Sequence, residues 1–178
     1  MKLQISQMVE GENPFHFESD KDGWVKDVLH HVEKQGYHVQ GNLTLDLNIT
    51  KLEPDYYMRG RLSFKVSQIC SRCAEAFPLP LNFPFEMGFV HAANVKSQES
   101  AASEESEELD VNFFEGNEID LSPIVEEQFF LSIPYQALCK PDCNGICQQC
   151  GQNLNFSQCN CKKEIAENPF SVLQRLKR

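Results

Sequence analysis

The chain lacks a hydrophobic run that could cross a membrane, since no stretch of about 18 apolar residues occurs in its 178 residues. Its first residues, MKLQISQMVE, also lack the apolar core and cleavage site of a secretory signal peptide. Basic residues are scarce, because 16 Lys and Arg stand against 26 Asp and Glu, a formal net charge of −10. We therefore expect a soluble cytoplasmic protein without a simple polyanion-binding surface.

Residues typical of hydrolytic or acid–base catalysis are few. The chain has five histidines, and it shows no sequence cluster of His, Asp and Glu suited to metal-assisted hydrolysis. His30 and His31 are adjacent, so they cannot share one face of a helix. Glu126 and Glu127 are also adjacent, and they fit a helix N-terminus better than an acid–base pair. We therefore expect a protein that is not an enzyme.

The acidic residues are concentrated in the middle of the chain. Residues 96–138 carry a charge of −10, residues 1–95 carry −3 and residues 139–178 carry +3. Within the middle, residues 96–110 are rich in Ser, Ala and Glu and predict a solvated loop. We therefore predict two parts, an α+β domain over residues 1–138 with an acidic loop at 96–110, and a cysteine-rich segment with a short helix over residues 139–178.

Three segments alternate apolar and polar residues with the period of a β-strand. The clearest spans residues 43–49, a return strand follows from Met58 to Val66, and a third segment runs from Phe77 to Phe89. This third segment carries three prolines at even positions, so all three remove N–H donors from the same edge. We expect it to be a sheet edge that cannot recruit another strand on its outer side.

Helices are predicted where cap residues precede apolar residues at helical spacing. Ser19 begins a predicted helix over residues 20–34, Ser122 caps a second one, and Asn168 caps a short third one near the end of the chain. Two or three helices beside consecutive strands predict an α+β fold. Its sheet should be a mainly antiparallel meander with flanking helices and a C-terminal cysteine-rich zinc knuckle.

Six of the eight cysteines lie within residues 139–161, with the spacing Cys-x3-Cys-x3-Cys-x2-Cys-x8-Cys-x-Cys. Cysteines this close at turns are typical of sites that hold Zn²⁺ in a tetrahedron of thiolates. Disulfides are disfavoured without a secretory signal, and the spacing lacks the runs of iron–sulfur ferredoxins. Because the segment contains no histidine, the expected site is all-sulfur and structural. The candidate ligands are Cys139, Cys143, Cys147, Cys150, Cys159 and Cys161.

The spacing leaves the division of these ligands open. Cys147 and Cys150 form the firmest pair, and Cys159 and Cys161 can complete a site with them. The other two candidates can replace that second pair or join a binuclear six-thiolate cluster. If Cys70 and Cys73 instead join Cys139 and Cys143, the eight cysteines make two four-thiolate sites. Cys70-Ser-Arg-Cys73 lies at a turn between two predicted strands, which favours a structural or metal-binding role over redox catalysis.

Several stretches, in order, resemble one known family. They are CSRC after a strand, EIDLSPIVEEQFFLSIP, LCKPDCNGICQQCGQNLNFSQCNC and a closing NPFSVLQRL. Together they resemble the YceD family of large ribosomal RNA subunit accumulation proteins, over roughly the last 110 residues. Some members of that family lack the C-terminal cysteines, which implies that a metal supports the fold of this branch. The chain departs from many relatives in its ending, which has Asn168-Pro169-Phe170 in place of an acidic Asp-Pro-Arg.

The resemblance implies a role in ribosome assembly, namely the accumulation or processing of large-subunit (23S) ribosomal RNA. The expected partner is a basic large-subunit ribosomal protein or a precursor of the large subunit, with ribosomal RNA contacted through the basic C-terminal tail. Two other functions remain open at this point. One is a thiol oxidoreductase that uses Cys70 and Cys73, and the other is a zinc-ribbon regulator that binds nucleic acid.

Overall fold

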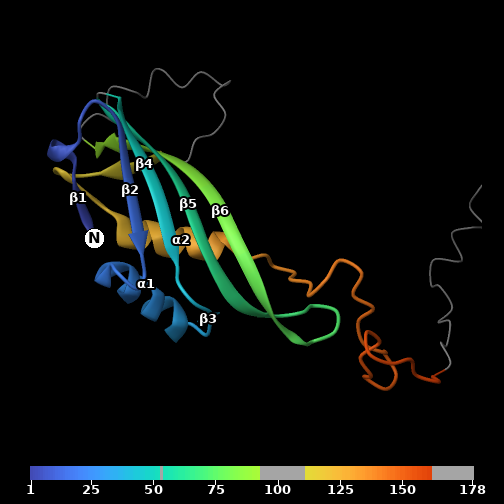
Figure 1. The fold of residues 1–178 in the computed structure, drawn as a ribbon. Helices are drawn as coiled ribbons and strands as arrows, with labels where there is room; N and C mark the ends of the chain where they lie inside the picture. Colours follow the sequence, from blue (N-terminus) through green and yellow to red (C-terminus); the bar gives the residue numbers. More distant parts are fainter. Residues whose placement is uncertain (53, 93–110, 162–178) are drawn as a thin grey trace, which may run out of the picture.

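The computed structural model of the protein describes residues 1–52, 54–92 and 111–161. These residues form an α+β fold in which two helices lie against one face of a long, mixed β-sheet (Figure 1). In chain order the elements are β1 Lys2–Gln4, a 3₁₀ turn Ile5–Gln7, β2 Gly11–Glu18, α1 Gly23–Lys34, β3 His38–Val39, β4 Thr44–Leu52, β5 Asp55–Ile69, β6 Ala76–His91, β7 Val111–Phe114, β8 Glu118–Asp120 and α2 Leu121–Ser132. No helix of the described part is long and apolar enough to span a bilayer.

The main sheet has the order β2-β4-β5-β6-β7, and β3 pairs with β5 beside the end of β4. Strands β2, β4, β5 and β6 are antiparallel neighbours, as the alternation in the sequence predicts. The predicted inward residues are buried, for example Leu45, Ile49, Met58 and Val66, which are all fully covered. A second, two-stranded sheet pairs β1 with β8 and brings residues 2–4 beside residues 118–120. The predicted meander is therefore confirmed for its central strands.

The prolines of β6 lie opposite polar residues of β5, in the pairs Ser67–Pro78, Lys65–Pro80 and Arg61–Pro84. A proline has no backbone N–H to donate to a neighbouring strand. At these three positions the missing N–H belongs to the edge of β6 that points away from β5. Over its proline-bearing part β6 is indeed the edge of the sheet, as predicted. The prediction is wrong for the end of the strand, because β7 pairs in parallel with Gly88–His91. That pairing begins only beyond the last proline, where the edge has its N–H donors again.

One hydrophobic core fills the space between the sheet and the two helices. Phe129 of α2 is completely buried and stacks on Phe64 of β5, with ring centroids 4.4 Å apart. Tyr37 packs its ring edge against Phe129 at 5.8 Å. Helix α1 contributes Val25 and Val32, which are also fully buried. Apart from Val90 near the end of β6, the buried apolar side chains of the main sheet face this helical side.

Two predicted helix caps are wrong by a few residues. Helix α1 begins at Gly23 after Asp22, whereas the Ser19 hydroxyl accepts a hydrogen bond from the Leu43 N–H and is buried. Helix α2 begins after Asp120, whose carboxylate accepts from the Ser122 N–H. In both cases an acidic residue near the predicted serine takes the cap position. The predicted loop at residues 96–110 and the predicted C-terminal helix lie outside the described residues.

Gly60 of β5 gives the fold a testable close contact. A Cβ atom at this position would lie 2.0 Å from the ring atom Cζ of Phe85, which is buried on the paired strand β6. Replacing Gly60 with alanine therefore forces a packed ring to move, and we expect a loss of about 1–3 kcal/mol in the free energy of unfolding. Urea denaturation monitored by the fluorescence of Trp24 would measure this loss. An unchanged denaturation midpoint would contradict the packing described here.

Candidate metal centres

The eight cysteines gather into two groups of four. The proximal cluster contains Cys70, Cys73, Cys139 and Cys143, and within each cluster all four sulfur atoms lie within 4.8 Å of one another. The distal cluster comprises Cys147, Cys150, Cys159 and Cys161. Every cysteine is a free thiol. Cys70 and Cys73 lie in the turn between β5 and β6, whereas the other six cysteines follow α2 in the segment that runs past the end of that hairpin (Figure 1).

The sulfur separations fit a single tetrahedral ion. The Sγ atoms of Cys70 and Cys143 are 3.8 Å apart, and those of Cys73 and Cys139 are 3.7 Å apart. A tetrahedron with metal–sulfur bonds of about 2.3 Å has edges of about 3.8 Å, whereas a disulfide bond is only about 2.05 Å long. The proximal separations therefore fit one metal ion, and the sulfur atoms of the distal cluster, all within 4.8 Å of one another, are also close enough to share one.

The proximal cluster joins two distant parts of the chain. Cys70 and Cys73 lie at the turn between β5 and β6, where the Cys70 N–H donates to the Glu75 carbonyl at 2.9 Å. The other two ligands follow α2, and the Ser71 N–H donates to the Ala137 carbonyl at 2.8 Å to hold that segment beside the turn. Three of the four cysteines are buried, with Cys70 only 2% exposed. This cluster therefore fastens the segment after α2 to the tip of the hairpin.

The distal cluster is built by a short local fold. Gly151 has a φ of +73°, which lets the chain turn sharply after Cys150, and its N–H donates to the Cys147 carbonyl at 2.9 Å. The Cys147 N–H donates to the Gln152 carbonyl at 2.8 Å. Cys150 is exposed and the other three cysteines are half-buried. This cluster is thus more open to solvent than the proximal one.

Asn155 connects the two clusters. It lies in the loop between Cys150 and Cys159 of the distal cluster, and its Nδ2 donates to the Sγ of Cys143 in the proximal cluster at 3.3 Å. Its Oδ1 accepts from the Asn144 N–H at 2.9 Å. Hydrogen bonds from such neighbours orient the ligands of a metal ion and raise its affinity. The two centres therefore share one supporting side chain.

The thiols within each cluster differ in acidity. In the proximal cluster a backbone hydrogen bond from Cys139 lowers the pKa of Cys70 to about 6, whereas burial raises the pKa of Cys139 to about 12. In the distal cluster a backbone hydrogen bond from Cys150 lowers the pKa of Cys147 to about 6. The thiol of Cys150 raises the pKa of Cys161 to about 12. Four thiolates repel one another in a confined space, and a bound cation removes that repulsion.

These pKa values predict proton release when a metal ion binds. Coordinated cysteines are thiolates, so near pH 7 both Cys139 and Cys161 must lose a proton. We expect the release of at least one proton per cluster, and a metal affinity that falls as the pH is lowered from 8 to 6. Calorimetric titration of the metal-free protein in buffers with different ionisation enthalpies would count the protons. Binding without proton release would contradict the described sulfur environment.

The structure brings together the four cysteines that the sequence analysis grouped at the end of the chain. It does not place Cys139 and Cys143 with them, so a binuclear six-thiolate cluster is not formed. Those two meet Cys70 and Cys73 instead, the pairing that the sequence analysis left as an alternative. The proximal cluster thus brings together cysteines about 70 positions apart in the sequence. The spacing of cysteines along the chain does not predict such a distant pairing.

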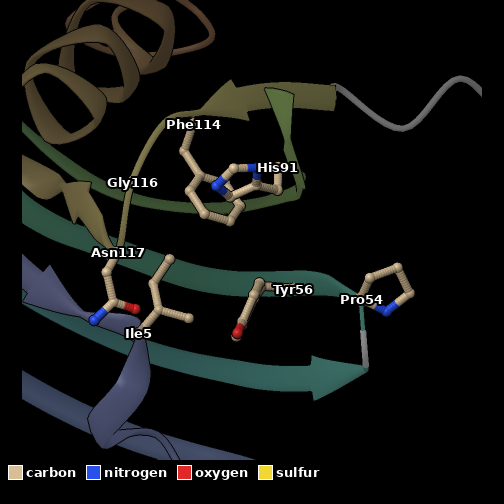
Figure 2. A pocket seen from close by; sticks show the side chains of 7 residues that line it. All are labelled: Ile5, Pro54, Tyr56, His91, Phe114, Gly116 and Asn117. Carbon is tan, nitrogen blue, oxygen red and sulfur yellow. The ribbon is translucent and has the colours of Figure 1, made fainter. Parts of the chain in front are cut away.

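A small cavity lies beside Tyr56 at the start of β5, whereas the Cys70–Cys73 turn follows the other end of that strand. Figure 2 shows the side chains that line the cavity. Its volume is about 220 Å³, below the roughly 300–1,000 Å³ of ordinary ligand pockets. Tyr56 and His91 each pack against the ring of Phe114, at centroid distances of 5.9 and 5.1 Å. The remaining lining residues are Ile5, Pro54, Gly116 and Asn117. We therefore interpret this cavity as a packing gap between aromatic side chains and not as a ligand site.

Comparison with known proteins bears on the region that contains both clusters. The family model described as large ribosomal RNA subunit accumulation protein YceD matches residues 58–177, two thirds of the chain, and this span includes all eight cysteines. The chain belongs to the YceD family. No solved structure matches it significantly.

Two relatives that carry the family's name are plant proteins. A chloroplastic homolog of Arabidopsis thaliana, named large ribosomal RNA subunit accumulation protein YCED homolog 1, is 35% identical over 63 residues, which is 35% of this chain. The Zea mays protein of the same name is 46% identical over 46 residues, or 25% of this chain. The chain covers only 20% and 16% of those two relatives.

A bacterial relative aligns over much more of the chain. The uncharacterized protein YlbN of Bacillus subtilis is 25% identical over 174 residues, which is 86% of this chain and 95% of that protein. The similarity to YlbN therefore extends well beyond the part that the YceD family model matches.

Proposed function

We propose that this protein is a non-catalytic ribosome biogenesis factor that supports the accumulation or processing of large-subunit (23S) ribosomal RNA. The observation that carries this proposal is the match of two thirds of the chain to the YceD family model, whose description names large ribosomal RNA subunit accumulation. The names of the two plant relatives support the same role.

We also propose that each cluster holds one Zn²⁺ ion in a structural role. Four sulfur atoms complete the tetrahedron that Zn²⁺ prefers and leave no ligand position for a substrate. The sulfur separations of 3.7 and 3.8 Å in the proximal cluster support a single ion of this size. A mononuclear iron site has the same geometry, so elemental analysis of the purified protein is the direct test.

The proposed partner is a basic large-subunit ribosomal protein or a precursor particle that contains one. The segment from residue 111 to residue 138 carries five acidic residues and no Lys or Arg. Glu118 and Asp120 pair with Lys2 and the N-terminal amine, and Glu126 contacts His31, whereas Glu115 and Glu127 are exposed. A surface of one charge attracts a partner of the opposite charge and accelerates its encounter. The attraction is screened by salt, so the complex should weaken as ionic strength rises.

Deletion of the gene tests the proposed function. In a strain without it, we expect a lower ratio of large to small ribosomal subunits on a sucrose gradient and less mature 23S ribosomal RNA. The tagged protein should migrate with large-subunit precursors at low salt. Normal subunit ratios in the deletion strain, together with no migration alongside precursors, would overturn the proposal.

One observation favours a second candidate, a thiol oxidoreductase. The pKa of Cys70, in a Cys-x-x-Cys turn, is lowered to about 6, as in reactive thiols. Cys70 is nevertheless only 2% exposed, so a disulfide substrate has little access to its sulfur. Reduction of insulin disulfides by the purified protein tests this candidate. Activity that disappears in the Cys70→Ser variant would support it over a structural metal site.

A further inference from the structure

On the face of the main sheet opposite the helices, the middle strand β5 presents exposed basic side chains. Side chains alternate along β5, so Arg59, Arg61 and Lys65 all point to this outer face. All three are exposed. They lie two and four positions apart along β5, which is the middle strand of the sheet.

Two acidic residues of the outer face, Asp46 and Glu18, contact side chains other than Arg61. Asp46 lies directly opposite Arg61, but its carboxylate contacts the Nδ1 of His16 at 2.6 Å. Glu18 binds Lys21 at 2.8 Å and also contacts His16. Neither carboxylate forms a salt bridge with Arg61 in the described part of the chain.

Glu86 is engaged at the next position along the strands. Its carboxylate contacts the Nε of Arg59 at 3.4 Å and accepts a hydrogen bond from the Tyr57 hydroxyl. The guanidinium of Arg59 in turn lies 5.2 Å from the centre of the Tyr57 ring. These three residues form a closed group that presents an aromatic ring and a cation together.

Arg61 and Lys65 are left without an ion-pair partner among the described residues. On the β6 side each faces a proline, Pro84 and Pro80 respectively, which carries no charge. On the other side of Lys65 lies the segment that follows β3, where the Gln40 N–H donates to the Lys65 carbonyl at 2.7 Å. Arg61 and Lys65 are thus two exposed cations without a salt bridge to any described residue, although Asp46 is the register partner of Arg61 on β4.

We propose that this outer face, centred on Arg61 and Lys65, binds the sugar–phosphate backbone of RNA. The inference rests on the proposed role in ribosomal RNA accumulation. Phosphates are bound by Arg and Lys together with hydroxyl and amide side chains, and Ser63 and Asn82 lie paired between the two cations on the same face. An open sheet face with aromatic and basic residues is a common RNA-binding platform. The contact would be backbone-directed and would carry little sequence preference.

Fluorescence anisotropy of the full-length protein with a fluorescein-labelled 20-nucleotide oligouridine RNA, at several KCl concentrations, tests this face. For the double variant Arg61→Ala/Lys65→Ala we expect at least about tenfold weaker binding at low salt. The slope of log affinity against log salt should fall in magnitude by about 1.4, or about 0.7 per lost phosphate contact. Both side chains are exposed, so the urea denaturation midpoint should not change.

A matched control separates this face from the effect of total charge. Lys26→Ala/Lys34→Ala removes the same two charges from exposed positions on α1, on the helical side of the sheet. This variant should bind the RNA within twofold of the unchanged protein. Equal losses in both double variants, or no loss in the outer-face variant, would overturn the proposal. Competition by polyglutamate as effective as competition by unlabelled RNA of the same length would also overturn it, in favour of an acidic protein partner.

The deletion strain keeps this inference distinguishable from the proposed function. If the deletion lowers large-subunit accumulation and the outer-face variant fails to restore it although Lys26→Ala/Lys34→Ala does, both proposals are supported. If the outer-face variant restores accumulation fully, the role of this face is overturned while the proposed function stands. If the deletion has no effect on subunit ratios, the proposed function fails, whatever the RNA affinity of the purified protein.

Discussion

Replacing Cys143 with serine should halve the metal content of the protein, from two ions per chain to one. Its sulfur is 3.8 Å from that of Cys70 and accepts a hydrogen bond from Asn155, so it is central to the proximal cluster. Loss of a direct ligand should reduce metal affinity by more than the roughly 10–100-fold that loss of an outer hydrogen-bond partner costs. Inductively coupled plasma mass spectrometry of the purified variant would measure the content.

Replacing Cys161 with serine is the matched experiment on the distal cluster. It should also leave one ion, but with different structural consequences. The proximal cluster ties the hairpin tip at Cys70 and Cys73 to the segment after α2, whereas the distal cluster closes only a local loop. We therefore expect amide hydrogen exchange to accelerate at both the hairpin tip and residues 137–143 in Cys143→Ser. In Cys161→Ser the increase should be confined to residues after 144.

The two centres should also lose their ions at different rates in chelator. Cys150 of the distal cluster is exposed, whereas Cys70, Cys73 and Cys143 of the proximal cluster are buried. We expect two phases of release from the unchanged protein, and the fast phase alone should disappear in Cys161→Ser. A single phase with two ions, or one ion per chain in the unchanged protein, would show that the clusters are not two independent sites.

Local patterns in the sequence are enough to predict the central strands and the edge prolines. Alternation of apolar residues fixes which face of a strand is buried, and this physical rule holds for β4, β5 and most of β6. Sequence patterns do not predict a local structure that depends on contact with a residue far away in the chain. Ser19 fits a helix cap by its spacing, but the N–H of Leu43 on the neighbouring strand provides it with a donor instead. The parallel pairing of β7 with β6 likewise depends on segments separated by residues 92–110.

The metal centres follow the same division between local and distant information. The distal cluster comes from one compact run of residues, so spacing alone suggests its four ligands. The proximal cluster needs Cys70 and Cys139, which only the fold brings together. Two cysteines at a strand turn and two more beyond a helix are a usable signal when the total of eight divides into two sets of four. To choose two sets of four ligands, one must know that the segment after α2 lies beside the tip of the β5–β6 hairpin.

Replacing Phe129 with alanine should be the most damaging single change in the core. The side chain is completely buried, stacks on Phe64 and contacts the rings of Tyr37 and Phe130. Truncation of a buried phenylalanine removes this packing and leaves a cavity, which costs about 3–5 kcal/mol in the free energy of unfolding. Such a loss is a large fraction of the roughly 5–15 kcal/mol of a typical domain. Urea denaturation followed by the fluorescence of Trp24, the single tryptophan, would measure it.

Leu131→Ala provides the control on the same helix, because this side chain is 61% exposed. It should change the free energy of unfolding by no more than about 0.5 kcal/mol. Comparable losses in both variants would indicate that α2 does not face the sheet through Phe129.

The metal content of the variants separates the two sources of stability in the molecule, the packed core and the cysteine clusters. Phe129 contacts no cysteine of either cluster, so Phe129→Ala should retain both ions wherever it is folded, whereas Cys143→Ser should retain the packed core and lose one ion.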